Sequence, residues 1–159
     1  MKGDKEIIGL LEQALQMEIT AIFAYFLHAE MLADWGVKKL AALEKKASID
    51  EMHHAEWLIE HILFLEGRPT MKTHQEAKPG ADVKGIIEFD LNLEYDARKF
   101  YNESIATCGA KKDNGSKAIF ERLLAEEEEH IDFLETQLDL IKQIGIENYI
   151  VAMSEGPKS

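Results

Sequence analysis

Two copies of the pattern Glu-x-x-His occur in the chain, one at Glu51 and His54 and the other at Glu127 and His130. In an α-helix, residues three positions apart lie on the same face, so both side chains of such a pair can reach one point. Carboxylate oxygens and imidazole nitrogens bind metals, and each pair is therefore a candidate two-ligand clamp. One copy alone is weak evidence, because glutamate and histidine are common in helices.

The second pair repeats the first at an offset of 76 residues, and this offset also relates other residues. It takes Glu18 to Glu94 and Tyr25 to Tyr101. In each half of the chain, the two glutamates lie equally far from an expected turn, so antiparallel pairing brings them to the same height. We interpret the repeat as two related helical hairpins that face each other.

A bundle of these hairpins would place six residues at one level of its interior: Glu18, Glu51, His54, Glu94, Glu127 and His130. Four buried carboxylates without compensation would cost far more than the net stability of a domain, about 5–15 kcal/mol. Two divalent cations cancel the four negative charges, and both histidines can be neutral nitrogen ligands. The oxygen-rich set favours iron or manganese over structural zinc.

The repeat also predicts a role for each ligand. Single glutamates from two helices, together with Glu-x-x-His pairs from two others, are the pattern of di-iron carboxylate proteins. We expect Glu18 and Glu94 to be terminal ligands, and Glu51 and Glu127 to bridge the two metals. In the alternative interpretation, the six residues lie on the surface and their equal heights are a coincidence.

Apolar spacing and helix breakers predict the elements that position these residues. Helices are expected at about 4–34, 38–66, 83–108 and 117–144, followed by a short helix at about 147–153. Residues 67–82 contain two prolines and two glycines without an apolar period, and an extended segment of this length can cross a bundle from end to end. The predicted fold class is all-α: residues 1–159 form a single domain, a four-helix bundle with one long crossover and a short C-terminal fifth helix.

Composition limits the classes of protein and partner. The 159 residues carry a formal net charge of −12, which argues against a nucleic-acid partner. The single cysteine, Cys108, excludes an internal disulfide and a CxxC metal knuckle, and we expect it to be a small packed thiol. No signal-peptide pattern and no membrane-spanning apolar run are apparent, so we expect a cytoplasmic protein without a membrane partner.

Six further motifs occur along the chain: MKGD at the start, YFLHAEM at 25–31, SIDEMHHAE at 48–56, ILFLEGRP at 62–69, EEEHIDFLETQLDLI at 127–141 and GIENYI at 145–150. With these motifs, the chain resembles the bacterioferritins over nearly its whole length. The resemblance implies a ferritin-like four-helix bundle and a homo-oligomeric shell of twenty-four subunits built from dimers. It also implies a ferroxidase that oxidises Fe(II) with O2 or peroxide at a di-iron centre and stores Fe(III) mineral, with a small ferredoxin as reductant for iron release.

The resemblance further implies haem b at a two-fold subunit interface, with Met52 as its ligand. Helical geometry turns Met52 about 100° away from the metal-binding face. Apolar residues line a comparable flank of the first helix: Ile8, Ile19, Phe23 and Phe26. Such a flank indicates a buried subunit interface, which haem or ordinary packing of Met52 could fill.

Four other residues receive smaller roles. Tyr25 resembles the tyrosine beside the family's di-iron site, and the resemblance implies that it supplies an electron or orders water; core packing is the alternative. Asp90 could orient a ligand histidine, and Asp50 could lie near the inner surface or be an ordinary solvated residue. Lys46 departs from relatives that have an iron-binding histidine there, which leaves the route of iron or electrons to the cavity open.

The sequence allows three classes of function. Iron storage with ferroxidase activity accounts for the six ligands and for the resemblance. A non-storage di-iron peroxidase of rubrerythrin type would share the centre without the shell, and the absence of any CxxC pair argues against an attached rubredoxin domain. A metal-free helical assembly protein leaves four core carboxylates without compensation.

Overall fold

Asp4 caps the first helix. Its Oδ1 accepts hydrogen bonds from two backbone N–H groups of the first turn, at 2.9 Å and 3.2 Å. The computed structural model describes residues 1–154, and this helix, α1, spans Lys5–Asp34. Gly36, with φ +84°, permits the turn into α2, Lys38–Phe64. The second helix ends two residues before the predicted boundary at 66, because Glu66 takes a left-handed φ of 65°.

The second hairpin consists of α3, Val83–Ala110, and α4, Asn114–Ile144. The fourth helix begins three residues before the predicted position 117, because Asp113 caps it. The two carboxylate oxygens of Asp113 accept the backbone N–H of Ser116 at 3.0 Å and its hydroxyl at 2.7 Å. The third helix extends two residues past the predicted end at 108.

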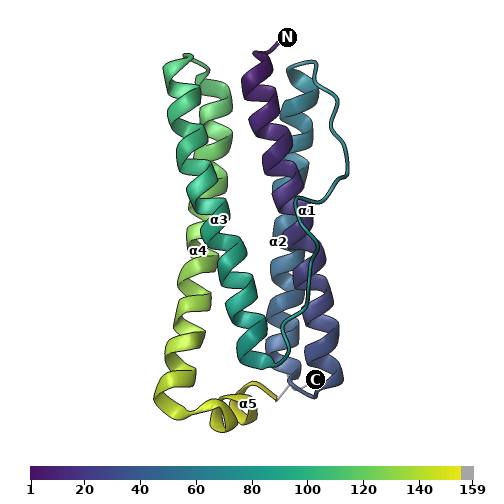
Figure 1. The fold of residues 1–159 in the computed structure, drawn as a ribbon, viewed down its shortest axis with the longest axis vertical. Coiled ribbons are helices and arrows are strands. Elements are labelled where there is room, and N and C mark those ends of the chain that lie inside the picture. The colour runs from purple at the N-terminus through teal and green to yellow at the C-terminus, as the bar shows by residue number, and fades with distance from the viewer. Residues whose placement is uncertain (155–159) are drawn as a thin grey trace.

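The two hairpins lie side by side as a four-helix bundle (Figure 1). The helices pack mainly within their own hairpin, while α1 with α3 and α2 with α4 make the contacts between hairpins. A short fifth helix, α5, Ile146–Ser154, lies across one end. The predicted all-α bundle with a crossover and a fifth helix is confirmed, and residues 1–154 contain no strand.

The crossover, residues 65–82, runs the length of the bundle along α1 (Figure 1). The backbone N–H of His74 donates to the Thr20 hydroxyl at 2.8 Å and to the Gln16 carbonyl at 3.2 Å. Further along, the N–H of Gly80 donates to His28 Nε2 at 3.1 Å. The crossover is thus attached to α1 at two heights.

Two hydrophobic clusters fill the bundle, one toward each end. The first includes Leu11, Leu58 and Phe120, and the second includes Leu40 and Leu134. Buried carboxylates from the middle of all four long helices lie between them. The core is therefore two apolar layers separated by a polar one.

Contrary to expectation, α1 is long and apolar enough to cross a membrane by length and composition. It is the only such helix within residues 1–154. Half of the apolar stretch is buried inside the bundle, and the helix carries the buried Glu18. These features are those of a core helix, which passes the same test.

Candidate metal centre

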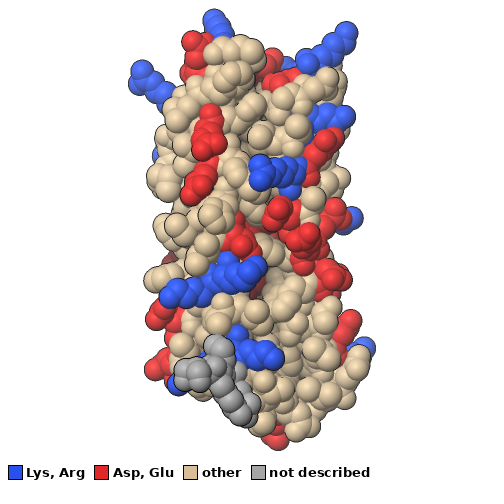
Figure 2. Space-filling view, turned by 180° about the vertical axis from the view of Figure 1, so that it is seen from behind, with Lys and Arg blue, Asp and Glu red and all other residues tan. Residues whose placement is uncertain are grey.

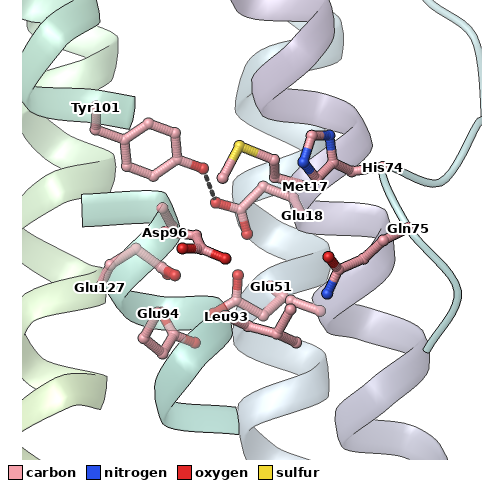
Figure 3. Close-up of a pocket in the computed structure, with 12 residues that line it drawn as sticks. Met17, Glu18, Glu51, His74, Gln75, Leu93, Glu94, Asp96, Tyr101 and Glu127 are labelled. Carbon is pink, nitrogen blue, oxygen red and sulfur yellow. Dashed lines mark hydrogen bonds between the residues drawn. The ribbon is translucent and has the colours of Figure 1, made fainter. Parts of the chain in front are cut away.

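The structure brings the six predicted ligand residues together at mid-height in the bundle. Figure 3 shows the four carboxylates directed toward one space. The residues are Glu18 on α1, Glu51 and His54 on α2, Glu94 on α3, and Glu127 and His130 on α4. Five are buried, and the His130 side chain is 16% exposed. The surface alternative is therefore wrong.

The ligand atoms form two groups, and within each group all atoms lie within 4.8 Å of one another. The two groups share Glu51 and Glu127. Each group adds one glutamate and one histidine of its own: Glu18 and His54 in the first, Glu94 and His130 in the second. This sharing supports the predicted bridging role of Glu51 and Glu127.

Both histidines direct Nδ1 at the carboxylates. His54 Nδ1 lies 3.0 Å from Glu127 Oε1 and 3.4 Å from oxygens of both Glu18 and Glu51. His130 Nδ1 lies 2.9 Å from Glu51 Oε1. Each nitrogen can therefore share an ion with the surrounding carboxylates.

Two tyrosines form hydrogen bonds across the hairpins to Glu18 and Glu94, the predicted terminal ligands. The Tyr25 hydroxyl donates to Glu94 Oε1 at 2.6 Å, and the Tyr101 hydroxyl donates to Glu18 Oε1. In both glutamates the other oxygen has no hydrogen-bond partner, so it can bind a metal. Tyr101 was not among the predicted site residues, although the offset of 76 that relates it to Tyr25 was a signal for it.

Charge compensation without a metal depends on protons. Burial lowers the pKa of His54, but nearby Glu127 and other carboxylates outweigh burial and raise it to about 10. His130 behaves in the same way, because Glu94 outweighs burial and raises its pKa to about 9. Burial and neighbouring carboxylates raise the pKa of Glu51 well above its ordinary value. In the metal-free centre, protons on these side chains therefore offset the negative charge that metal cations would otherwise offset.

The donor set fits two metal ions. Eight buried oxygen and nitrogen atoms of the six residues have no hydrogen-bond partner, which is costly unless a ligand binds them. A cavity of about 20 Å³ lies among the four carboxylates, more than the roughly 10–15 Å³ that one water needs. His74 and Gln75 of the crossover and Asp96 of α3 also line it (Figure 3).

His130 faces a second cavity, of about 290 Å³, between α2 and α4. Figure 2 shows this side of the molecule, with acidic side chains gathered near its middle. The cavity is also lined by Glu44, Lys46, Asp50 and Glu129. Asp50 Oδ2 lies 3.4 Å from His130 Nε2 and 3.5 Å from Lys46 Nζ.

Asp50 therefore lies beside His130, a predicted ligand, in the position that we expected of Asp90. Asp90 Oδ1 instead lies 2.8 Å from Nδ1 of His28, which is not among the predicted ligands. The expectation for Asp90 was wrong because this residue lies one helical turn from Glu94, at the height of His28.

The predicted haem-binding flank is only partly exposed. Met52 is 49% exposed, and Phe23 and Phe26 are also exposed. Ile19 differs, because it is 1% exposed and belongs to the same core cluster as Leu15. The expectation that Ile19 lies on the flank is wrong, since its side chain faces the interior.

The family model of the ferritin-like domain matches residues 8–144. The bacterioferritin of Brucella melitensis is 49% identical over 94% of this chain and 92% of its own length. That of Rhodobacter capsulatus is 42% identical over 94% of this chain and 92% of its own. That of Mycolicibacterium paratuberculosis is 38% identical over the full length of both chains.

Proposed function

Because the chain belongs to the bacterioferritin family of ferritin-like proteins, we propose that it stores iron, oxidising Fe(II) to Fe(III) at the six-residue centre and depositing mineral in a hollow shell. The observation that carries this proposal is the pair of four-residue groups that share Glu51 and Glu127. Shared carboxylates suit two ions held together. Two Fe(II) ions can supply two electrons to O2 or peroxide when both are bound.

The chain's own residues hold and orient the substrate iron. Glu18 and Glu94 each keep one oxygen on a tyrosine hydroxyl and leave the other free. Those hydrogen bonds fix the carboxylate planes before iron arrives, as partners of metal ligands commonly do. Four carboxylates match the charge of two Fe(II) ions, so the filled centre is neutral. Tyr25 is in addition a candidate electron donor.

We also propose haem b between two subunits, held by Met52 of each. A methionine thioether is a recognised ligand of haem iron. Met52 is half exposed on a helix that also exposes Ile49, so a second copy of the chain would cover an apolar surface. The resemblance adds a shell of twenty-four subunits and a ferredoxin that reduces the stored iron.

A haem titration of the assembled protein tests this role. Met52→Leu keeps an apolar side chain of similar size but removes the sulfur. We expect the Soret absorption of bound haem to be lost in Met52→Leu and kept in Met71→Leu, an exposed methionine of the crossover. Equal haem binding by both variants would exclude Met52 as the ligand.

The storage proposal is tested by aerobic loading with excess Fe(II), followed by sizing chromatography. We expect a shell-sized particle that retains far more than two irons per chain. Retention that stops at about two, the capacity of one centre, would favour a rubrerythrin-type peroxidase over storage.

A matched pair of variants tests whether Fe(II) is oxidised at the six-residue centre. Glu127→Gln removes a predicted bridging carboxylate, while Glu128→Gln changes the exposed neighbour that faces Arg98. We expect rapid Fe(II) oxidation to be lost in Glu127→Gln and retained in Glu128→Gln. Rapid oxidation by both variants would exclude the centre as the site of reaction.

A further inference from the structure

Three buried titratable side chains lie together beside the metal centre: His28 on α1, Glu44 on α2 and Asp90 on α3. One ligand-type atom of each lies within 4.8 Å of the other two. His28 and Asp90 are 0% exposed and Glu44 is 3% exposed. His28 is three residues after Tyr25, and Asp90 is four residues before Glu94. The cluster therefore lies about one helical turn from the centre.

Hydrogen bonds define the tautomer of His28. The backbone N–H of Gly80 donates to Nε2 at 3.1 Å, which requires a lone pair on that nitrogen. The proton of the neutral ring is then on Nδ1, which donates to Asp90 Oδ1 at 2.8 Å. Burial lowers the pKa of His28 and so favours the neutral ring. His28 thus orients Asp90 without supplying a positive charge.

The remaining carboxylate oxygens of Glu44 and Asp90 have no hydrogen-bond partner. Both oxygens of Glu44 and Oδ2 of Asp90 are buried without a hydrogen-bond partner. Within residues 1–154, no Lys or Arg side chain forms an ion pair with either carboxyl. Two adjacent buried carboxylates repel, whereas one proton removes a charge and supplies an O–H donor.

We propose that Glu44 and Asp90 share one proton and, resting on the proposed function, that this proton leaves through Glu44 when oxidation raises the charge of the metal centre. Glu44 lines the 290 Å³ cavity, together with Tyr25 and His130. Glu44 is therefore the residue of the pair through which a proton can reach the space that His130 faces. Asp90 does not line this cavity, which makes Glu44 the exit.

The step is an acid dissociation. The O–H bond of the Glu44 carboxyl breaks, its electron pair stays on the carboxylate oxygen, and the proton passes to solvent in the cavity. The pair then carries two negative charges instead of one. It offsets part of the positive charge gained by the centre, and no electron moves in this step.

Titratable or charged groups on every neighbouring helix surround the pair or line the same cavity. They are Tyr25 and His28 on α1, Lys46 and Asp50 on α2, Glu94 on α3, Glu126, Glu129 and His130 on α4, and Tyr149 on α5. Burial and then Asp90 raise the pKa of Glu44 well above its ordinary value, and Glu94 adds to the rise. Positive charge gained beside Glu94 opposes that rise, so the pKa of Glu44 falls and the proton is released.

A divalent cation is a poorer occupant of this cluster. Nδ1 of His28 carries a hydrogen, so only the three free oxygens of Glu44 and Asp90 could bind a cation. Hard divalent cations take about six oxygen ligands. The geometry therefore favours a proton, and a third metal ion becomes an outcome of the test.

The experiment is infrared spectroscopy of the assembled protein loaded with Zn(II), near neutral pH. Zinc fills the metal centre and removes protons from its ligand carboxyls, but it cannot change oxidation state. We expect a C=O band of a protonated carboxylic acid that shifts in D2O. The band should be absent in Glu44→Gln, which keeps an N–H donor for Asp90, and present in Glu129→Gln, an exposed residue of the same cavity.

Absence of the carboxylic acid band from the zinc-loaded wild type would overturn the shared proton, and this measurement does not depend on the folding of any variant. The same band in Glu44→Gln would also overturn it. Three zinc ions per chain in the wild type, falling to two in Glu44→Gln, would show that the pair binds metal. None of these outcomes depends on iron oxidation, so they leave the proposed function untouched.

The coupling is tested by an oxidised-minus-reduced infrared difference spectrum of the iron-loaded protein. We expect loss of the carboxylic acid band on oxidation in the wild type and in Glu129→Gln, and no such change in Glu44→Gln. A band that persists through oxidation would refute the coupling. Failure of the iron to oxidise would refute the proposed function instead, and the zinc measurement would still decide on the shared proton.

Discussion

Filling the metal centre should expel protons. At about pH 7 in the metal-free protein, His54 and His130 are protonated, because their pKa values are about 10 and 9. A histidine that binds a metal must be neutral, so these two side chains together release about two protons when Zn(II) fills the centre. Burial also raises the pKa values of Glu51 and Glu127, and protons released from them add to this number.

The released protons determine how affinity depends on pH. Each proton released on binding changes the binding free energy by about 1.4 kcal/mol per pH unit, a factor of about ten in affinity. Two protons therefore give at least about a hundredfold tighter overall binding for each unit by which the pH rises near neutrality. The gain ends as the pH passes the raised pKa of each histidine.

Isothermal titration calorimetry with Zn(II), repeated in buffers of different ionisation enthalpy, counts these protons directly. His54→Gln should lower the count by about one and weaken binding, because it removes a ligand that must lose a proton. His53→Gln is the matched control, since His53 is the adjacent residue and its side chain is 57% exposed. It should leave both the count and the affinity unchanged.

Two results would refute this reasoning. Zinc binding that releases no protons near neutral pH would show that the histidines are neutral before metal binds. Equal proton release from His54→Gln and His53→Gln would show that the released protons do not come from His54.

Three further predictions concern the core and the contacts of the ligands. Phe120→Ala should lower the free energy of unfolding by about 3–5 kcal/mol in denaturant titrations, because the side chain is fully buried; a loss below about 1 kcal/mol would contradict its core role. Tyr101→Phe should weaken zinc binding by about 10–100-fold, because Glu18 loses its hydroxyl donor; unchanged calorimetric affinity would argue against that role. Burial raises the pKa of Cys108 to about 11, so a thiol reagent should label this residue only after unfolding, and rapid labelling of the folded protein would contradict its packing.

The offset of 76 residues predicted which six residues meet at mid-height, because residues with the same offset occupy equivalent places in two similar hairpins. Burial of Glu18 and Glu94 follows from that pairing. The crossover was also predictable, since its prolines and glycines interrupt the apolar period between two long helices.

Other features depend on how the helices are rotated against one another. Ile19 follows Glu18 directly, and a small rotation of α1 decides whether its side chain faces the core or the flank. The partners of Asp90 and Asp50 depend in the same way on the helix opposite each residue. Glu44 is buried on the inner face of its helix, but its approach to Asp90 is a contact between different hairpins, which periodicity within one helix does not specify.

The equal division of the ligands between the hairpins suggests an ancestry for the chain. Each hairpin supplies one single glutamate and one Glu-x-x-His pair, and its tyrosine reaches the glutamate of the other. A half-length ancestor that paired with an identical copy would have presented the same six ligands around a two-fold axis. Fusion of two such copies would have required only a segment long enough to run from one end of the bundle to the other, and residues 65–82 have that length and course.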